Sequence, residues 1–335
     1  MSQLEIEKQN RLEIRGGQLS RMAKRRKRRQ WCDRVFVGLS VVVAIACVSV
    51  LGVLLYRIAM QGSEYLSFSF LENLPSRFAK KAGMYTAIIG SLWIVVVCAI
   101  FAVPLGICTA IWLEEYGAKS RLGKKVRAFV AMNISNLAGV PSIVYGLLGL
   151  TVFVYGLGLL GDLDNADLVF GWEDSIFFIR FPFGKSVLSS GLTLGLVVLP
   201  VIITSSQEAL RAVPNAIRQG ALALGATRWQ MVWRTTLPMA TPGMMTGTIL
   251  GLSRAIGEAA PILIVGASLY ANFVPEHLMD RHSAMPLQIY GWTGKPQAAF
   301  HQVAASGIIV LLAILLSINA VAIFIRIKFE KASRS

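Results

Sequence analysis

Charged residues are scarce in this sequence. Asp, Glu, Lys and Arg make up 15% of the 335 residues, whereas a soluble globular domain averages about 25%. Apolar residues make up 55%, and the mean hydropathy is +0.60. Because so few polar side chains cannot cover the surface of a water-soluble fold, the sequence predicts an integral membrane protein.

Cysteine and histidine are also sparse. The four cysteines show no CxxC spacing, which argues against a disulfide framework or a zinc site, and we expect all of them to be packing residues: Cys32, Cys47, Cys98 and Cys108. The three histidines fall in the last predicted external loop, where we expect solvated side chains: His277, His282 and His301.

Motifs of bond-breaking chemistry are missing as well. The sequence has no HExxH and no GxSxG, and its Gly294-Lys295 pair is followed by Pro296 instead of the Ser or Thr of a phosphate-binding loop. We therefore expect no catalytic residue, no metal site and no cofactor in this chain. If ATP drives the protein, a separate subunit must bind it.

The net charge of +15 comes from 33 basic and 18 acidic residues, and eight of the basic residues lie between Arg21 and Arg34. A basic run directly before a long apolar stretch is typical of a segment that stays cytoplasmic. Binding of anionic lipid head groups is compatible with that interpretation. Nucleic-acid binding is disfavoured because no recognition motif follows the run.

Six apolar stretches are predicted to cross the membrane as helices, because about 20 residues at 1.5 Å each span the hydrocarbon core. They are 35–56, 84–113, 128–160, 187–206, 243–267 and 303–325. With the amino terminus inside, the cytoplasmic segments carry 21 basic residues and the external loops carry eight. This asymmetry predicts that both termini are cytoplasmic.

Two of these spans contain helix-breaking residues. Pro104 is expected to interrupt the second span, and the third is expected to break around Asn133, Asn136, Gly139 and Pro141. Breaks of this kind occur along transport pathways and also as ordinary packing devices. In the second external loop, the sequence FFIRFPF is expected to lie on the membrane surface or to form a short strand.

The fifth span holds two ionisable residues, Arg254 and Glu258. An ionised side chain at the bilayer centre costs about 2.5–3.5 kcal/mol, so it should face protein or water. One interpretation is an i,i+4 ion pair that locks two helices. The other is a polar passage in which a planar, multidentate guanidinium attracts an oxyanion and the nearby carboxylate lets it leave again.

A helical wheel places the charged pair within a stripe of small residues, because residues four apart on a helix lie on one face. The stripe consists of Gly243, Gly247, Gly251 and Ala255. Small residues allow close helix approach. We therefore expect this face to meet another helix or a narrow conduit rather than lipid.

The segment 207–238, between the fourth and fifth spans, predicts two short helices around a glycine turn. Pro214 suits the start of the first helix, Gly225 its end, and Thr227 with Gln230 forms a capping-box pattern that opens the second. Pro238 is expected to end the second helix. A basic, partly apolar structure of this size is larger than a connection needs and offers a surface to a soluble partner.

This segment resembles the signature of bacterial ABC import permeases, which reads EAA, three residues, Gly, nine residues, then Ile-x-Leu-Pro. Gln219-Gly220-Ala221 stands at EAA, Gly225 at the glycine, and Leu237-Pro238 at the ending, while the acid and the isoleucine differ. Three other stretches are similar to phosphate-type permeases: 138–150, 223–230 followed by 236–247, and 253–267. The last of these, together with 285–300, favours the PstA type over its PstC-type sister. The resemblance covers roughly residues 82–326.

The resemblance implies an all-α, polytopic protein with six transmembrane helices and the type I ABC importer permease fold, in the bacterial cytoplasmic (inner) membrane. The implied division is a basic cytoplasmic tail (1–34), a permease domain (35–327) with its coupling loop (207–238), and a cytoplasmic tail (328–335). The implied pathway residues are Arg254, Glu258, Gly247 and Gly251. The implied ATPase-coupling residues are Gln219, Gly220, Ala221, Gly225, Leu237 and Pro238.

The partners implied are a cytoplasmic ATP-binding subunit, a PstC-type permease, an external phosphate-binding protein and membrane lipids. The function implied is half of the translocation pathway of an ATP-driven phosphate importer. The alternatives are a permease for another oxyanion (sulfate, molybdate or phosphonate), the sister subunit itself, or a membrane scaffold or regulator through which nothing passes.

Overall fold

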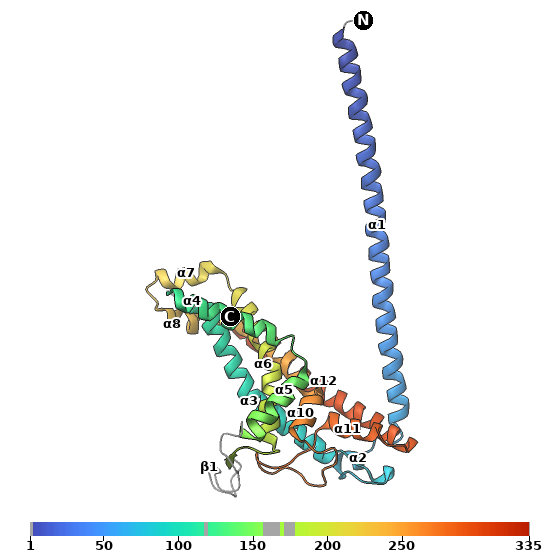
Figure 1. Ribbon diagram of the computed structural model, residues 1–335, viewed down its shortest axis with the longest axis vertical. Coiled ribbons are helices and arrows are strands. Elements are labelled where there is room, and N and C mark those ends of the chain that lie inside the picture. Colours follow the sequence, from blue (N-terminus) through green and yellow to red (C-terminus); the bar gives the residue numbers. More distant parts are fainter. Residues whose placement is uncertain (1–2, 117–119, 157–167, 171–177, 335) are drawn as a thin grey trace. The chain divides into compact units, whose positions relative to one another are not determined.

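The computed structural model describes residues 3–116, 120–156, 168–170 and 178–334, with side chains described at 31, 33–116, 120–156 and 178–328. The chain divides into two units, Met1–Met60 and Gln61–Ser335, and each is described by itself. Helices dominate, as predicted (Figure 1).

A single helix, α1 (Gln3–Gly62), contains both the basic tail and the first predicted span. Its apolar part, Asp33–Gly62, is long enough to cross a membrane. The predicted domain boundaries at 34/35 and 327/328 both fall inside helices, the second in α12 (Ala298–Arg334). These boundaries therefore mark changes of composition and not the ends of helices. The cytoplasmic location of the two tails stays a prediction.

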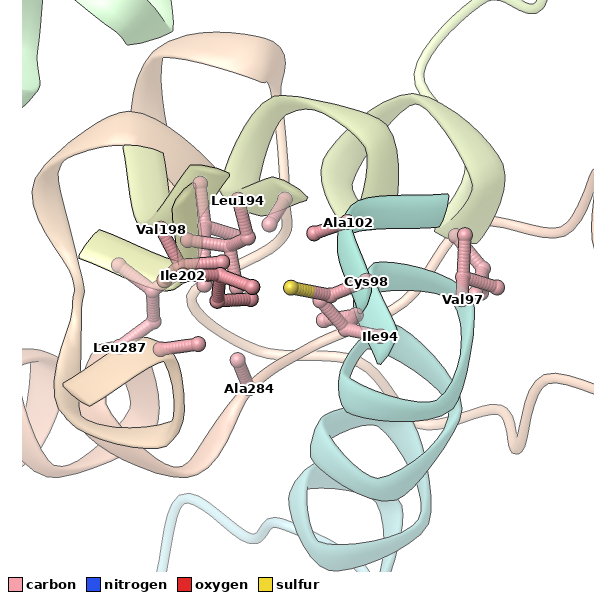
Figure 2. Close-up of a cluster of buried hydrophobic side chains, with 13 residues drawn as sticks. Ile94, Val97, Cys98, Ala102, Leu194, Val198, Ile202, Ala284 and Leu287 are labelled. Carbon is pink, nitrogen blue, oxygen red and sulfur yellow. The ribbon is translucent and has the colours of Figure 1, made fainter. Parts of the chain in front are cut away.

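The second unit is built on four helices that pack in the order α3, α6, α9, α12. Their bounds are Tyr85–Glu115 for α3, Val187–Arg211 for α6, Leu237–Gly257 for α9 and Ala298–Arg334 for α12. Figure 2 shows the core between α3 and α6, where the sulfur of Cys98 points into a cluster of buried apolar side chains that includes Leu194 and Ile202. Cys98 is thus a packing residue, whereas Cys47 and Cys108 are exposed and do not fit that prediction.

By length and composition, four helices of the described residues qualify as membrane spans: 33–62, α3, α6 and 298–328. A fifth qualifies if the bent pair α4 (Arg121–Leu137) and α5 (Ser142–Gly149), which continues into the π-helical turn η2 (Leu150–Val154), counts as one span. The fifth predicted span, 243–267, corresponds to α9 and the short α10 (Ala260–Val265). Those two helices do not meet this criterion of length and hydropathy.

The predicted break at Pro104 is wrong, because α3 runs through that proline without interruption. Packing holds the helix on both sides of it: Ala102 is fully buried, and a Cβ built on Gly106 would lie 2.7 Å from Ile202 on α6. A proline is tolerated inside a membrane helix when neighbouring helices fix its two halves.

The predicted break in the third span is confirmed, and it is sharper than a kink. The axes of α4 and α5 differ by 110° across residues 138–141, with Pro141 as the N-cap of α5. Asn133 lies inside α4, where its side-chain amide donates to the Phe129 carbonyl at 2.7 Å. Residues 128–160 are therefore not one straight span, and residues 157–160 lie outside the described part of the chain.

Loop elements link the helices at one end of the second unit. They are α2 (Phe68–Glu72), the 3-10 turn η1 (Ala79–Lys81) and α11 (Met285–Thr293). The buried Gln288 donates to the Gly83 carbonyl at 2.8 Å, and Ser306 donates to the Gly62 carbonyl at 2.6 Å. These bonds bring the first and third predicted external loops to the same end of the unit.

Two details of these loops were decided by the fold. Part of the FFIRFPF stretch is a strand, β2 (Ile179–Phe181), paired antiparallel with β1 (Leu168–Phe170). His282 is only 1% exposed, so the prediction of a solvated side chain is wrong for this histidine. Its burial lowers the pKa of His282 to about 4, since a charged imidazolium loses its hydration there.

Candidate functional site

Arg254 and Glu258 lie where the fifth predicted span breaks. The helix α9 ends at Gly257, and Glu258 caps it with extended backbone (φ −79°, ψ 119°) before α10 begins at Ala260. The continuous helix assumed in the wheel is therefore wrong at this point. A signal was present in the sequence, because Pro261 at the start of a helix marks a new helical beginning.

The two side chains pair across this break. Arg254 Nε donates to Glu258 Oε1 at 3.1 Å, and the exposed fractions of the side chains are 57% and 18%. Within the described residues, this is the one hydrogen bond of the Arg254 guanidinium, so its two terminal nitrogens are left to bind another acceptor. Interrupted backbone at membrane depth is tolerated only where it is buried in protein or lines a water-filled cavity.

The small residues of α9 pack against another helix, whereas the Arg254 guanidinium is exposed. Gly247 and Gly251 are buried, and a Cβ on Gly247 would overlap the side chain of Ser205 on α6, while one on Gly251 would lie 3.2 Å from Ile202. The glycine stripe is thus the contact surface between α9 and α6. The sequence predicted that these glycines meet either another helix or a conduit. In the structure they contact another helix.

The open part of α9 lies near its C-terminal end, beside Arg254. Three residues further on, Gly257 is exposed, and a Cβ added to it would have no heavy atom within 4 Å. Next to Arg254, Ser253 contacts Asn319 on α12 through their side-chain oxygens. The sequence analysis did not find this polar contact, because Asn319 is 66 positions away and nothing near it marks a partner.

The segment between α6 and α9 has the predicted two helices, α7 (Asn215–Ala223) and α8 (Arg228–Met231). The amide of Gly225 donates to the Leu222 carbonyl, the amide of Ala226 donates to the Ala221 carbonyl, and φ of Gly225 is +86°. This is a Schellman ending, which requires the left-handed conformation that glycine adopts without strain. The capping box of Thr227 and Gln230 is confirmed, with both reciprocal hydrogen bonds present.

Pro238 does not end the second helix as predicted. After α8, the chain continues through a π-helical turn, η4 (Val232–Thr236), directly into α9, so Leu237 and Pro238 form the first turn of that helix. The wider turn resets the hydrogen-bond register just before Pro238, which has no N–H to donate. The predicted start of the fifth span at residue 243 is wrong for the same reason, and Pro242 lies inside α9.

The tip of this segment is exposed and partly apolar. Gln219, Gly220 and Gly225 are exposed, and so are large apolar side chains around them: Leu222, Leu224, Trp229 and Trp233. Leu224 is 92% exposed. In the second unit, α7 and α8 lie at the end away from α2 and α11 (Figure 1).

Residues 102–332 match the family described as the binding-protein-dependent transport system inner membrane component. The chain belongs to this family. It is therefore a multi-pass inner membrane component of a transport system that depends on a binding protein. The matched residues include the whole segment from α6 to α12 and thus both Arg254 and the 207–238 segment.

Individual relatives support the assignment. The phosphate transport system permease protein PstA of Mycobacterium leprae is 37% identical over 255 residues, which cover 75% of this chain and 73% of the relative. The protein of the same name from Yersinia pestis is 29% identical over 314 residues, which cover 92% and 95%. The match thus extends over most of both chains and not over an isolated motif.

Solved structures agree on the fold. A MetNI methionine ABC transporter in an inward-facing conformation has a chain that aligns over 73% of this protein and 97% of its own length, with a TM-score of 0.51 at 14% identity. A bacterial alginate ABC transporter, in complex with its pentasaccharide-bound periplasmic protein, aligns over 84% and 92% with a TM-score of 0.56 at 16% identity. The type I ABC importer permease fold expected from the sequence is thereby confirmed.

Proposed function

We propose that this chain is one of two permease subunits of an ATP-driven importer of inorganic phosphate, and that it lines half of the passage. The names of its relatives support phosphate as the substrate. The observation that supports a substrate passage in this chain is the guanidinium of Arg254, which is exposed, incompletely hydrogen-bonded and next to a helix break. A guanidinium presents donors in a planar fork that suits a tetrahedral oxyanion.

In this proposal the pair with Glu258 tunes the affinity. A lone guanidinium in a water-excluded passage holds a phosphate anion tightly, and a pathway that retains its substrate cannot turn over. The carboxylate at 3.1 Å competes for the guanidinium, so that the anion visits and leaves. Gly247 and Gly251 act by packing α9 on α6, which fixes the position of Arg254.

The segment 207–238 is proposed to dock on a cytoplasmic ATPase that binds the ATP, with Gln219, Gly220, Ala221, Gly225, Leu237 and Pro238 at or near the contact. Its exposed leucine and tryptophan side chains support a protein partner. The remaining proposed partners are a PstC-type permease, a phosphate-binding protein on the external side, and anionic lipids at residues 21–34.

The proposed orientation has both termini in the cytoplasm. The structure groups the loops in a matching way: the C-terminal ends of α3 and α6 meet through the Glu114–Arg211 ion pair, at the end opposite the Gln288 bond. Cysteines placed at Ser120 and Ser76, in a chain with its native cysteines replaced by alanine, are expected to react with impermeant reagents from opposite sides. Labelling of both from the same side would refute the orientation.

The function is tested with the reconstituted complex of both permeases, the ATPase and the phosphate-loaded binding protein. We expect ATP-dependent uptake of radiolabelled phosphate that arsenate competes and sulfate does not. Arg254→Gln is expected to abolish uptake with the complex intact, while Arg254→Lys retains part of it. Competition by sulfate would indicate another oxyanion. ATPase activity that ignores the loaded binding protein would favour a scaffold or regulator.

A further inference from the structure

The helix α3 ends on two consecutive carboxylates, Glu114 and Glu115. Acidic side chains are unfavourable there, because the last carbonyls of a helix already carry partial negative charge. Each carboxylate has its own arginine: Arg211 Nη2 lies 2.6 Å from Glu114, and Arg218 Nη2 lies 2.7 Å from Glu115. Arg211 is on α6 and Arg218 is on α7, so the end of α3 touches both elements.

The two ion pairs differ in burial. The side chains of Arg211 and Glu114 are 64% and 12% exposed, whereas those of Arg218 and Glu115 are 16% and 5% exposed. Water screens the attraction within an exposed ion pair, so such a pair contributes little to holding two elements together. Removing one partner of a buried pair leaves a charge without compensation, so the Arg218–Glu115 contact resists separation.

Arg218 binds more than the carboxylate. Its Nη1 donates to the Val213 carbonyl at 2.6 Å, and its Nη2 also donates to the Leu210 carbonyl at 2.7 Å. The Leu210 carbonyl lies in the last turn of α6, where helical backbone lacks partners of its own, and the Val213 carbonyl lies in the short connection from α6 to α7. One guanidinium therefore connects the carboxylate of α3, the end of α6 with the connection that follows it, and the helix α7 that carries it.

The helix α7 depends on this connection because it has little else to fix it to the membrane bundle. None of its residues is buried. Apolar packing therefore does not anchor α7, although it is the helix that carries Gln219, Gly220 and Ala221 at the exposed tip. Lysine in place of Arg218 could not reach three acceptors at once, since it lacks the planar fork of donors.

From α6 the contacts continue to the proposed substrate site. The helices α3 and α6 share the core shown in Figure 2. The helix α6 is also in direct contact with Gly243 and Gly247 of α9, the helix that carries Arg254 in its last turn. Tightly packed elements move as bodies and do not deform continuously.

We propose that Arg218 and Glu115 are positioning residues that transmit displacement of α7 to α3 and α6, and through α6 to the segment that holds Arg254. This inference rests on the proposed ATP-driven function. It makes the buried pair the mechanical link between the docking surface and the transmembrane helices. The Arg211–Glu114 pair, one residue away and with an exposed arginine, has no such role.

The test measures ATP hydrolysis and radiolabelled phosphate uptake in the same proteoliposomes, with the full complex. Glu115→Gln and Arg218→Gln are expected to lower the phosphate transported per ATP at least tenfold, while the ATPase still co-purifies in the normal ratio. Arg211→Gln, the same kind of substitution in the neighbouring pair at an arginine that is 64% exposed, is the matched control and is expected to stay within twofold of the unaltered chain.

Glu115→Gln decides the question if Arg218→Gln fails to assemble, because it leaves Arg218 bound to the Leu210 and Val213 carbonyls and removes only the link to α3. An unchanged ratio of phosphate to ATP in Glu115→Gln would overturn the inference. Loss of ATPase co-purification in this variant would overturn it too, because the pair would then maintain the docking surface instead of transmitting motion. Failure of the proposed function looks different, since the unaltered complex would then take up no phosphate.

Discussion

Gly247 lies so close to Ser205 that a methyl group on the glycine would occupy the position of the serine side chain. This contact sets the distance between α9 and α6, and two more small residues continue it: a Cβ on Gly243 would lie 2.7 Å from Ala209, and one on Gly251 would lie 3.2 Å from Ile202. Backbones approach this closely only where side chains are absent.

Gly247→Ala is therefore expected to destabilise the helix pair by about 1–3 kcal/mol, the usual cost of forcing an extra carbon into a packed contact. Thermal unfolding of the purified protein in detergent measures the loss. Gly257→Ala, in the last turn of the same helix with open space around it, is the control and should change the stability by less than about 0.5 kcal/mol. Equal effects of the two substitutions would contradict the packing role of Gly247.

Glu258→Gln is expected to free the Arg254 guanidinium of its competing carboxylate. If the pair tunes release of the anion, phosphate binds more tightly and leaves more slowly, so the maximal uptake rate falls several-fold while the apparent KM also falls. The exposed Glu276, changed to Gln, serves as a control for the loss of one negative charge. A rise in KM with an unchanged maximal rate would mean that Glu258 attracts substrate rather than releasing it.

Gly225→Ala is expected to strain the turn between α7 and α8, because a side chain at φ +86° costs about 1–2 kcal/mol. A local opening of that size corresponds to about a 5–30-fold faster tryptic cleavage at Arg228 in the folded protein. Gly220→Ala is the matched control, since Gly220 is helical and has open space around it. Cleavage at Arg228 should not accelerate in the Gly220→Ala variant. If both variants are cleaved at the same rate, the Schellman ending does not stabilise this turn.

His282 predicts a pH dependence of stability. The pKa of its buried imidazole is lowered to about 4, whereas an unfolded histidine titrates near 6.5. Between these values the unfolded chain binds a proton that the folded chain does not, so the free energy of unfolding falls as the pH is lowered through this window. From pH 7 to pH 5 the loss from this group is about 2 kcal/mol.

Thermal unfolding at a series of pH values, compared with the His282→Phe variant, checks this expectation. The variant is expected to lose that part of the pH dependence, even though its absolute stability also changes. His301→Gln is the control, because His301 is exposed and should leave the slope as it is. An identical slope in the unaltered chain and in His282→Phe would show that another group is responsible.

Local signals in the sequence were reliable where a few neighbouring residues determine the outcome. The capping box of Thr227 and Gln230 and the glycine ending at Gly225 involve hydrogen bonds between residues at most five positions apart. The break before Pro141 is of the same kind. Proline was misleading at Pro104 and Pro238, because contacts with other helices or a π-helical turn compensated for the missing donor.

Composition and short-range geometry were enough to predict the class of protein, the apolar segments, the connector helices and an Arg–Glu pair in the fifth apolar segment. The packing of the helices was needed to establish that α9 is open near Arg254, that its glycines contact α6, and that Glu115 meets Arg218 across 103 positions. Each of those facts depends on how separate helices approach one another. Nothing in the order of the residues marks a partner so far away.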